Sequence, residues 1–331
     1  MLKVCVVSQR VPFPPNKGEK LRTYHQVEYL VSLGYNIEVL SLCESEEDKR
    51  FAEQLAKKLN INVSVYQPGS KLARYGWALL NNLPISVGAF RAGDLQSAID
   101  DRLNGNSDVM LLAASSLSHY VFSSPVYPKT NCKLLMDFMD VDSDKWRQYA
   151  DTSNWPMNWV YGRESKGIRA LEATTNQKFD RCFLIAEEET KLFHEKVDNS
   201  KQVIVLGNGL DFDAFYPASK KGAEKSEQTP PNFLFTGVMD YKPNIDAVLW
   251  FVKACWPLVR ESFPTAQFTI AGMNPTDEIK SLNGKDGIEV TGFVDEILPY
   301  FHRADVFVAN IVLSLILHSI SLKSSPKLFT S

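Results

Sequence analysis

VIVLGNGLD (Val203–Asp211) and FLFTGVMDYKPN (Phe233–Asn244) are the two stretches that decide the fold, and a polar connector rich in Lys, Ser, Glu and Pro separates them. Each begins as an apolar, strand-like run and continues into a glycine-containing loop. Such runs on either side of a polar connector indicate that one α/β domain closes and a second opens across a hinge. Asn208 and Gly209 tolerate positive φ and let backbone amides face a ligand directly. We therefore expect a binding site beside the hinge.

Outward from the hinge, apolar runs alternate with helix-patterned segments along the chain. Strand-like runs before the connector lie at residues 3–7, 36–41, 63–66, 109–113, 132–137, 181–185 and 202–206, and after it at residues 233–236, 267–271, 288–291 and 306–309. Apolar residues recur at steps of three or four within residues 21–33, 46–59, 92–103, 163–179, 245–261, 276–282 and 295–302. This alternation predicts an α/β fold with two Rossmann-like, doubly wound domains and a ligand cleft between them.

The domain boundaries follow from this alternation and from the character of the last residues. We place a first Rossmann-like domain at residues 1–217, a linker at residues 218–231 and an incomplete second domain at residues 232–309. Residues 310–331 contain no Asp, Glu or Gly, but they contain six serines and an apolar run. This abrupt change indicates an atypical tail. A truncation or a shifted reading frame explains it better than a genuine replacement does.

The composition is that of an ordinary soluble globular protein of 331 residues, with 44% hydrophobic residues, 23% charged residues and a net charge of −3. This charge gives no reason to expect a nucleic-acid partner. No stretch approaches the roughly 18 apolar residues that span a bilayer, and the N-terminal run lacks the long apolar core of a secretory signal. The cysteines lack CxxC spacing and are expected to be buried thiols of a cytoplasmic protein, namely Cys5, Cys43, Cys132, Cys182 and Cys255.

The residues at the hinge carry a family resemblance. Asn208-Gly209-Leu210-Asp211, with Phe215 and Pro217, resembles the NG(V/L)DxxxFxP segment of retaining, nucleotide-sugar-dependent glycosyltransferases of the two-domain GT-B type (group 1, family 4). Residues 235–246, 269–275, 290–295 and 304–309 resemble the first four strands of that family's donor-binding domain. Residues 14–20 and 136–149 are similar to the sugar transferases of bacterial exopolysaccharide and exosortase (PEP-CTERM) loci. The resemblance covers residues 2–309.

The resemblance implies an enzyme that moves a sugar from a nucleotide-diphosphate sugar to an exopolysaccharide or another glycan precursor, with retention of configuration. In that family the second domain holds the donor and the first presents a glycan or lipid-linked acceptor. No cofactor besides the donor substrate is implied, and no metal. A nucleotide-sugar epimerase and a non-catalytic nucleotide-sugar-binding protein on the same fold are alternatives, because fold does not determine function. The donor sugar, its base and the oligomeric state stay open.

A loop after the first strand holds two candidate phosphate ligands. Lys17 and Gly18 stand at a helix N-terminus, where backbone amides and positive charge bind anions. The loop matches neither GxGxxG nor the P-loop, so a nicotinamide dinucleotide or ATP is not expected. The residues alone are slightly more typical of a surface loop than of a site. The resemblance, in which this loop closes over the cleft, favours a site.

The ends of two further strands hold candidate catalytic and acceptor-side residues. Asp140 and Asp142 form a DxD pattern, which can share a divalent cation but also occurs where carboxylates cap a helix. The resemblance places this position near the reacting carbon, so we expect both to be catalytic residues without a metal. Ser115 and Arg169 are expected on the acceptor side. His119 has a near-neutral intrinsic pKa, but a hydrogen-bonded helix residue is the simpler interpretation.

The second domain is expected to hold the donor diphosphate at its strand ends. The resembling enzymes use an Arg and a Lys there. This chain has Val238 at the arginine position and a lysine displaced by one residue. We expect that lysine and the backbone amides of the following helix to stabilise the leaving group. With the hinge residues, the predicted binding residues are Gly237, Lys242, Gly272, Asn208 and Gly209.

One segment and the tail bear on partners and activity. Residues 71–77 mix cations with aromatic side chains. Such a segment either contacts an anionic membrane surface, where lipid-linked acceptors reside, or covers its own sheet as an amphipathic helix, which is the more common case. The related enzymes continue after the fourth strand with two glutamates that bind the ribose and the donor sugar. Residues 310–331 contain none, so we expect impaired transfer by this chain.

Overall fold

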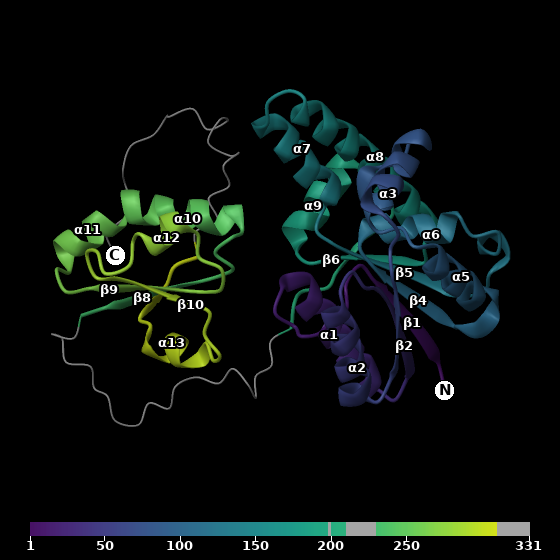
Figure 1. Cartoon of the computed structure of the whole chain (residues 1–331), viewed down its shortest axis with the longest axis horizontal. Coiled ribbons are helices and arrows are strands. Elements are labelled where there is room, and N and C mark those ends of the chain that lie inside the picture. The colour runs from purple at the N-terminus through teal and green to yellow at the C-terminus, as the bar shows by residue number, and fades with distance from the viewer. Residues whose placement is uncertain (198–199, 210–229, 310–331) are drawn as a thin grey trace. The chain divides into compact units, whose positions relative to one another are not determined.

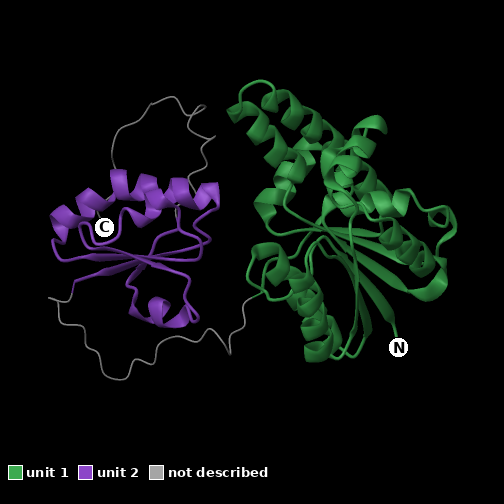
Figure 2. Cartoon of the chain, in the orientation of Figure 1, with its two compact units in different colours: residues 1–209 green, residues 210–331 purple. Residues whose placement is uncertain are grey.

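The computed structural model describes residues 1–197, 200–209 and 230–309. The chain divides into two compact units, Met1–Gly209 and Leu210–Ser331 (Figure 2). Each unit is built on its own parallel sheet with helices packed against it, which confirms the predicted α/β fold with two Rossmann-like sheets (Figure 1). Most of the expected linker, the whole of the expected tail and four residues of the hinge motif lie outside the described residues, the four being Leu210, Asp211, Phe215 and Pro217.

The sheet of the first unit has seven parallel strands in the order β3-β2-β1-β4-β5-β6-β7. The central neighbours are β1 (Lys3–Ser8) and β4 (Val109–Ala113). The strand order reverses between them, so the loops after these two strands flank the switch point where open α/β sheets bind ligands. The remaining strands are β2 (Asn36–Leu42), β3 (Asn62–Tyr66), β5 (Lys133–Met139), β6 (Arg181–Leu184) and β7 (Ile204–Val205).

Helices cover both faces of this sheet. Successive side chains of β1 point to opposite faces, so they pack in two different apolar clusters. Val4 and Val6 pack in one apolar cluster with Val27 of α1 (Gly18–Ser32), on the face that α2 (Glu46–Leu59) also covers. Cys5 and Val7 pack in a second cluster with residues of the other helices. Those helices are α5 (Gly93–Asp101), α6 (Ser118–Phe122) and α9 (Glu187–Lys196). A strand buried on both faces is why the sequence of β1 is a continuous apolar run.

Some helices begin elsewhere than the pattern predicts. The helix expected at 163–179 is α8 (Met157–Lys178), which begins six residues earlier and packs against α7 (Asp142–Thr152). In its first turns the large apolar side chain of Trp159 is 65% exposed and does not face the core, so the sequence shows no core-facing apolar spacing there. Residues 71–77 fall in α3 (Lys71–Leu80), which α4 (Ile85–Ala89) follows. Short helical turns complete the unit, namely η1 (Arg102–Asn106), η2 (Ser115–Leu117) and η3 (Tyr127–Lys129).

The second unit has a smaller parallel sheet in the order β10-β9-β8-β11. The helix expected at 245–261 is divided at Cys255, because Pro257 cannot donate a backbone hydrogen bond inside a helix. Phe251, Trp256 and Phe268 pack with ring centroids 5.0–6.3 Å apart and fill the core. The elements are β8 (Asn232–Thr236), α10 (Lys242–Ala254), α11 (Trp256–Ser262), β9 (Gln267–Ala271), α12 (Asp277–Lys280), β10 (Ile288–Gly292), α13 (Leu298–Arg303) and β11 (Val306–Phe307).

The cysteines are all free thiols, and four of the five are buried. Burial raises the pKa of Cys132 to about 11 and that of Cys182 to about 12. Such thiols stay protonated near neutral pH and are poor nucleophiles. Within the described ranges, no helix is both long enough and apolar enough to cross a membrane.

Candidate functional site

A buried ion pair organises the carboxyl edge of the first sheet. Asp137, at the end of β5, is fully buried and accepts from Arg22 of α1, with Nε–Oδ2 at 2.6 Å and Nη2–Oδ1 at 3.0 Å. Gln26 donates to the same carboxylate at 2.5 Å. Arg22 Nη1 also donates to Asn208 Oδ1 at 3.1 Å, so the hinge asparagine is held by the interior of the first unit. The sequence reasoning missed Arg22, because an arginine in the middle of a helix normally indicates a solvated face.

The loop after β1 places its predicted phosphate ligands at the surface. Lys17 precedes α1 as its N-terminal flanking residue, and no side chain caps that helix. Gly18 is the first residue of α1, and a Cβ at this position would meet nothing within 4 Å. Arg10 and Glu19 form an exposed ion pair at 2.8 Å beside them. The N-terminus of α1 is therefore open to an anion. Phosphate binding by Lys17 and Gly18 stays a prediction.

Two of the predicted polar residues come together after β4 and β5. Ser115 Oγ donates to Asp142 Oδ2 at 3.0 Å. Burial raises the pKa of Asp142, whereas Lys145 and the bond from Ser115 lower it. Asp140 is exposed and does not share this contact. Across the described ranges, no group of three or more His, Cys, Asp or Glu side chains is arranged to hold a metal ion.

A buried carboxylate lies next to this pair. Glu172 of α8 is fully buried, and its Oε1 accepts from the backbone amide of Ser143 at 3.1 Å. No hydrogen-bond partner reaches its Oε2, nor the Nε of Arg169. Burial raises the pKa of Glu172 to about 8, and Asp142 adds to the shift while Arg169 opposes it. Arg169, predicted on the acceptor side, thus acts electrostatically on Glu172.

Glu172 predicts a pH dependence of the stability of the first unit. Because its folded-state pKa of about 8 lies above the unfolded value of 4.5, the folded state holds more protons between these pH values. The free energy of unfolding therefore decreases as pH rises from 5 to 8, on the order of 3 kcal/mol from this group. Glu172→Gln should remove that part of the slope and raise stability at pH 8. Urea unfolding at several pH values measures it. Equal slopes for both proteins would contradict the assignment.

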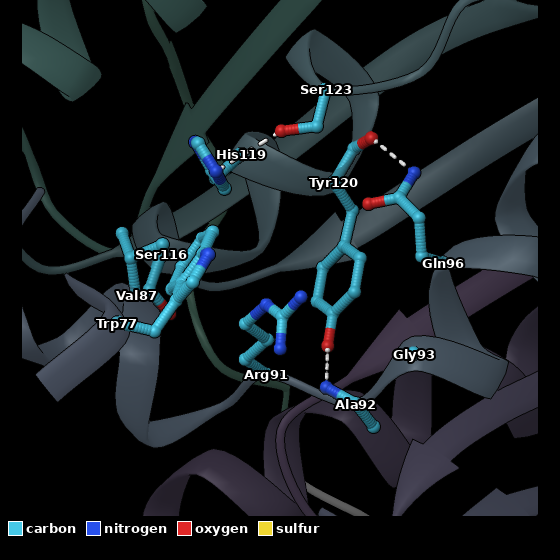
Figure 3. A pocket seen from close by; sticks show the side chains of 10 residues that line it. All are labelled: Trp77, Val87, Arg91, Ala92, Gly93, Gln96, Ser116, His119, Tyr120 and Ser123. Atoms are coloured by element: carbon cyan, nitrogen blue, oxygen red, sulfur yellow. Dashed lines mark hydrogen bonds between the residues drawn. The ribbon is translucent and has the colours of Figure 1, made fainter. Parts of the chain in front are cut away.

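A cavity of about 180 Å³ lies within the first unit (Figure 3). Trp77 comes from α3, Arg91 from the segment before α5, and His119 from α6. The guanidinium carbon of Arg91 lies 4.3 Å from the centroid of the Trp77 ring, and the His119 ring contacts the same tryptophan edge-on at 5.8 Å. Ser116 also lines the cavity and accepts from Gln9 of the β1 loop at 2.8 Å. One wall of the cavity therefore lies just after β4 and is hydrogen-bonded to the loop after β1.

The polar groups of the cavity are suited to binding rather than to proton transfer. Burial and the charge of Arg91 lower the pKa of His119, so its imidazole is neutral near pH 7. His119 Nε2 pairs with Ser123 Oγ at 3.0 Å, one helical turn further on. Tyr120 accepts from the Ala92 amide at 2.7 Å and donates to the Phe90 carbonyl at 2.6 Å, which fixes the segment that carries Arg91. Arg91 and Trp77 thus present a cation and an aromatic surface on a rigid wall.

In the second unit, two predicted glycines touch at the carboxyl edge of the sheet. Thr236 and Ala271 are partners in the β8–β9 register, so Gly237 and Gly272 follow side by side. Gly237 donates from its amide to the Ala271 carbonyl at 3.1 Å. A Cβ on Gly272 would lie 1.6 Å from the Gly237 carbonyl oxygen. Only glycine permits this approach, and it leaves the edge bare of side chains.

Helix α10 begins directly beyond this contact. Asn244 reaches back and donates to the Val238 carbonyl at 3.0 Å, which fixes the loop between β8 and α10. No side chain caps the N-terminus of α10. Lys242 is its first residue, has an 82% exposed side chain and forms an ion pair with Asp246 at 2.8 Å. A helix N-terminus, a lysine and a glycine edge together form a surface that can bind phosphate.

The residues of this edge lie within a stretch that is similar to a known family. Residues 230–321 match the family model described as "Glycosyl transferases group 1". An uncharacterized 44.6 kDa protein in the cps region of Klebsiella pneumoniae is 23% identical over 296 residues, which cover 87% of this chain and 66% of that protein. The chain thus spans just under two thirds of the length of this relative. The family match continues to residue 321, beyond residue 309, where the resemblance was expected to end.

The fold is shared with solved glycosyltransferases. Sucrose-phosphate synthase from Thermosynechococcus elongatus has a TM-score of 0.62 and 14% identity, covering 93% of this chain and 75% of that chain. The catalytic domain of starch synthase IV from Arabidopsis thaliana, bound to ADP and acarbose, has a TM-score of 0.52 and 10% identity, covering 93% and 77%. The chain therefore has the fold of the two-domain GT-B glycosyltransferases, and residues 230–321 are similar to the group 1 glycosyltransferase family model.

Proposed function

We propose that this protein transfers a sugar from a nucleotide-diphosphate sugar to a glycan or lipid-linked acceptor, with retention of configuration. The observation that carries the proposal is the group 1 family match over residues 230–321, which includes the glycine edge and the N-terminus of α10. The relative in the Klebsiella cps region supports a role in exopolysaccharide synthesis. The starch synthase with a similar fold is bound to ADP, which supports a nucleoside diphosphate as the leaving group.

The donor diphosphate fits the edge formed by Gly237, Gly272 and α10. The bare backbone lets phosphate oxygens approach closely, and the partial positive charge of the helix N-terminus favours an anion there. Lys242 adds a full charge once it turns from Asp246 toward the phosphate. As the bond to the anomeric carbon breaks, negative charge builds on the diphosphate, and fixed positive groups lower that barrier. We assign Gly237, Lys242 and Gly272 to this role.

The acceptor fits the cavity and the polar groups of the first unit. Trp77 offers an apolar ring face, and Ser116 and Gln96 offer hydrogen bonds, which is the combination that orients a sugar. The Ser115–Asp142 pair lies after β4 and β5, where a carboxylate can receive a proton from an acceptor hydroxyl. We assign Asp140 and Asp142 to the reacting end of the acceptor and Ser115 and Arg169 to its positioning.

Nucleotide binding tests the donor assignment. In calorimetric titrations with UDP, ADP and GDP, at least one nucleoside diphosphate should bind with a Kd below about 1 mM. Lys242→Ala should weaken that binding about fivefold to tenfold, because it removes a charge-assisted contact. Lys280→Ala is the matched control, since Lys280 is also an exposed lysine of the second unit paired with an aspartate of its own helix. The control should leave Kd unchanged. Absence of binding to all three nucleotides would overturn the donor assignment.

Product analysis separates transfer from the alternatives. Because residues 310–331 contain no glutamate, we propose that transfer by this chain is slow although nucleotide binding persists. Incubation with nucleotide sugars should then release little product, both with and without an acceptor. Conversion of a nucleotide sugar into its epimer without an acceptor would identify an epimerase. Transfer at ordinary enzymatic rates would contradict the expected impairment.

A further inference from the structure

Helix α3 exposes its apolar side. Leu72, in the first turn of α3, is 85% exposed. Leu79 and Leu80, at its end, are 49% and 89% exposed. The side that faces the unit instead buries Arg74, which donates to the Ala89 carbonyl. A surface helix normally turns its polar residues outward. The inverted arrangement of α3 therefore indicates that its outer side contacts something other than water.

The beginning of α8 extends this apolar side. Arg163 Nη2 donates to the Leu83 carbonyl at 3.0 Å, so the first turns of α8 lie beside the end of α3; Figure 1 shows both helices on the upper side of the first unit. Trp159 is one helical turn before Arg163, points to the same side and is 65% exposed. Trp155, just before α8, is 82% exposed. We call Leu72, Leu79, Leu80, Trp155 and Trp159 the α3–α8 surface.

The charges around the α3–α8 surface are cationic. Residues 54–93, which include α3, contain no Asp or Glu. In the first turns of α8 the acidic residue is Glu164, which is 2% exposed and accepts from the backbone amides of Ile85 and Ser86. Lys71 of α3 and Lys166 of α8 are exposed. Two exposed carboxylates on flanking elements are neutralised by ion pairs, Glu44 with Arg74 and Asp151 with Arg147.

We propose that the α3–α8 surface binds the anionic surface of a lipid bilayer. Tryptophans, exposed leucines and two exposed lysines match the layered chemistry of a membrane interface, with its acyl chains, carbonyl region and anionic headgroups. A protein partner fits less well, because protein interfaces are depleted in lysine and their binding energy rarely rests on leucine. The occupant is therefore a membrane that carries negative charge.

The same helix joins this surface to the cavity. Trp77 precedes Leu80 by three residues, so the two side chains are neighbours on the surface of α3, and Trp77 also lines the cavity. The cavity therefore lies next to the apolar side of α3. An acceptor with its lipid tail in the membrane can then place its polar head beside Trp77. This step rests on the proposed transfer function and assigns a lipid-linked, amphiphilic acceptor to it.

Vesicle flotation of the full chain tests the proposal. Vesicles of 70% phosphatidylcholine and 30% phosphatidylglycerol should carry the protein, and pure phosphatidylcholine should carry at least fivefold less. Leu72→Glu/Leu80→Glu should reduce binding to the anionic vesicles at least tenfold. Leu258→Glu is the control, because Leu258 is an exposed leucine (64%) on α11 of the second unit. The control should float like the original protein.

Further measurements keep the outcomes distinct. Circular dichroism and nucleotide titration of the Leu72→Glu/Leu80→Glu protein should match those of the original, which separates membrane binding from folding and from the donor assignment. No flotation with either vesicle, or equal losses in the double variant and the control, would overturn the proposal. Sedimentation velocity measures whether the protein forms a dimer. A dimer that the double variant converts to a monomer, without flotation, would make this surface a contact between copies of the chain.

Discussion

Replacing Gly272 by alanine is expected to unfold the second unit or to destabilise it by at least about 3 kcal/mol, the range of severe overpacking. The added Cβ would lie 1.6 Å from the Gly237 carbonyl oxygen and 2.8 Å from its carbonyl carbon. Both atoms belong to the backbone of Gly237, which follows β8 directly and is held by its amide hydrogen bond to the Ala271 carbonyl at 3.1 Å. Nucleotide binding should be lost together with the fold of this edge.

Denaturant unfolding of the full chain, followed by limited proteolysis of the second unit, measures this effect. Gly162→Ala is the control, since a Cβ at Gly162 in α8 would meet nothing within 4 Å. That substitution should stabilise the protein by up to about 1 kcal/mol, because alanine favours a helix over glycine. If Gly272→Ala unfolded at the same denaturant concentration as the original, the close contact of the two strand ends would be disproved.

The second large effect is expected from Asp137→Ala in the first unit. The substitution leaves the buried guanidinium of Arg22 without its carboxylate, because the side chains of this pair are only 4% and 0% exposed. Breaking a buried pair on one side costs about 3–5 kcal/mol, mostly as the penalty of an uncompensated charge. The loss should also release Asn208, which Arg22 holds. Urea unfolding of the first unit measures the change.

A double-mutant cycle separates the buried charge from the packing. Arg22→Met/Asp137→Leu should be clearly more stable than Asp137→Ala, because it removes both charges. Asp151→Ala is the surface control. The Asp151–Arg147 pair is exposed by 51% and 39%, and such pairs contribute about 0–1 kcal/mol. If Asp137→Ala lowered the free energy of unfolding no more than Asp151→Ala, the Arg22–Asp137 pair would not organise the sheet edge.

Much of the fold could be predicted because local pattern and tertiary environment agree. The predicted ranges 46–59, 109–113 and 267–271 are those of α2, β4 and β9. In α2 the start is encoded locally, since Ser45 and Asp48 form a reciprocal cap. Prediction failed where the environment differs from the usual one. The first turns of α8 expose Trp159, so they show no inward apolar spacing.

The candidate site could be predicted in part. Gly237 and Gly272 were predicted from their places after strands, and Ser115 and Asp142 from the ends of two neighbouring strands. The cavity could not be predicted, because Trp77, Arg91 and His119 come from three separate segments and contribute no shared motif. Arg22 was missed for a similar reason. Its partner Asp137 is 115 residues away, and only the sheet brings the two together.

By itself, the sequence determined the two parallel α/β sheets and the glycine-containing ends of their strands. Apolar runs, apolar residues at steps of three or four, and the backbone freedom of glycine are local properties of the chain. Only the tertiary structure decided which polar side chains meet and which apolar ones stay outside. Burial depends on neighbours distant in the chain, so the same leucine spacing could have filled a core. Instead it leaves Leu72 and Leu80 on the outer side of α3.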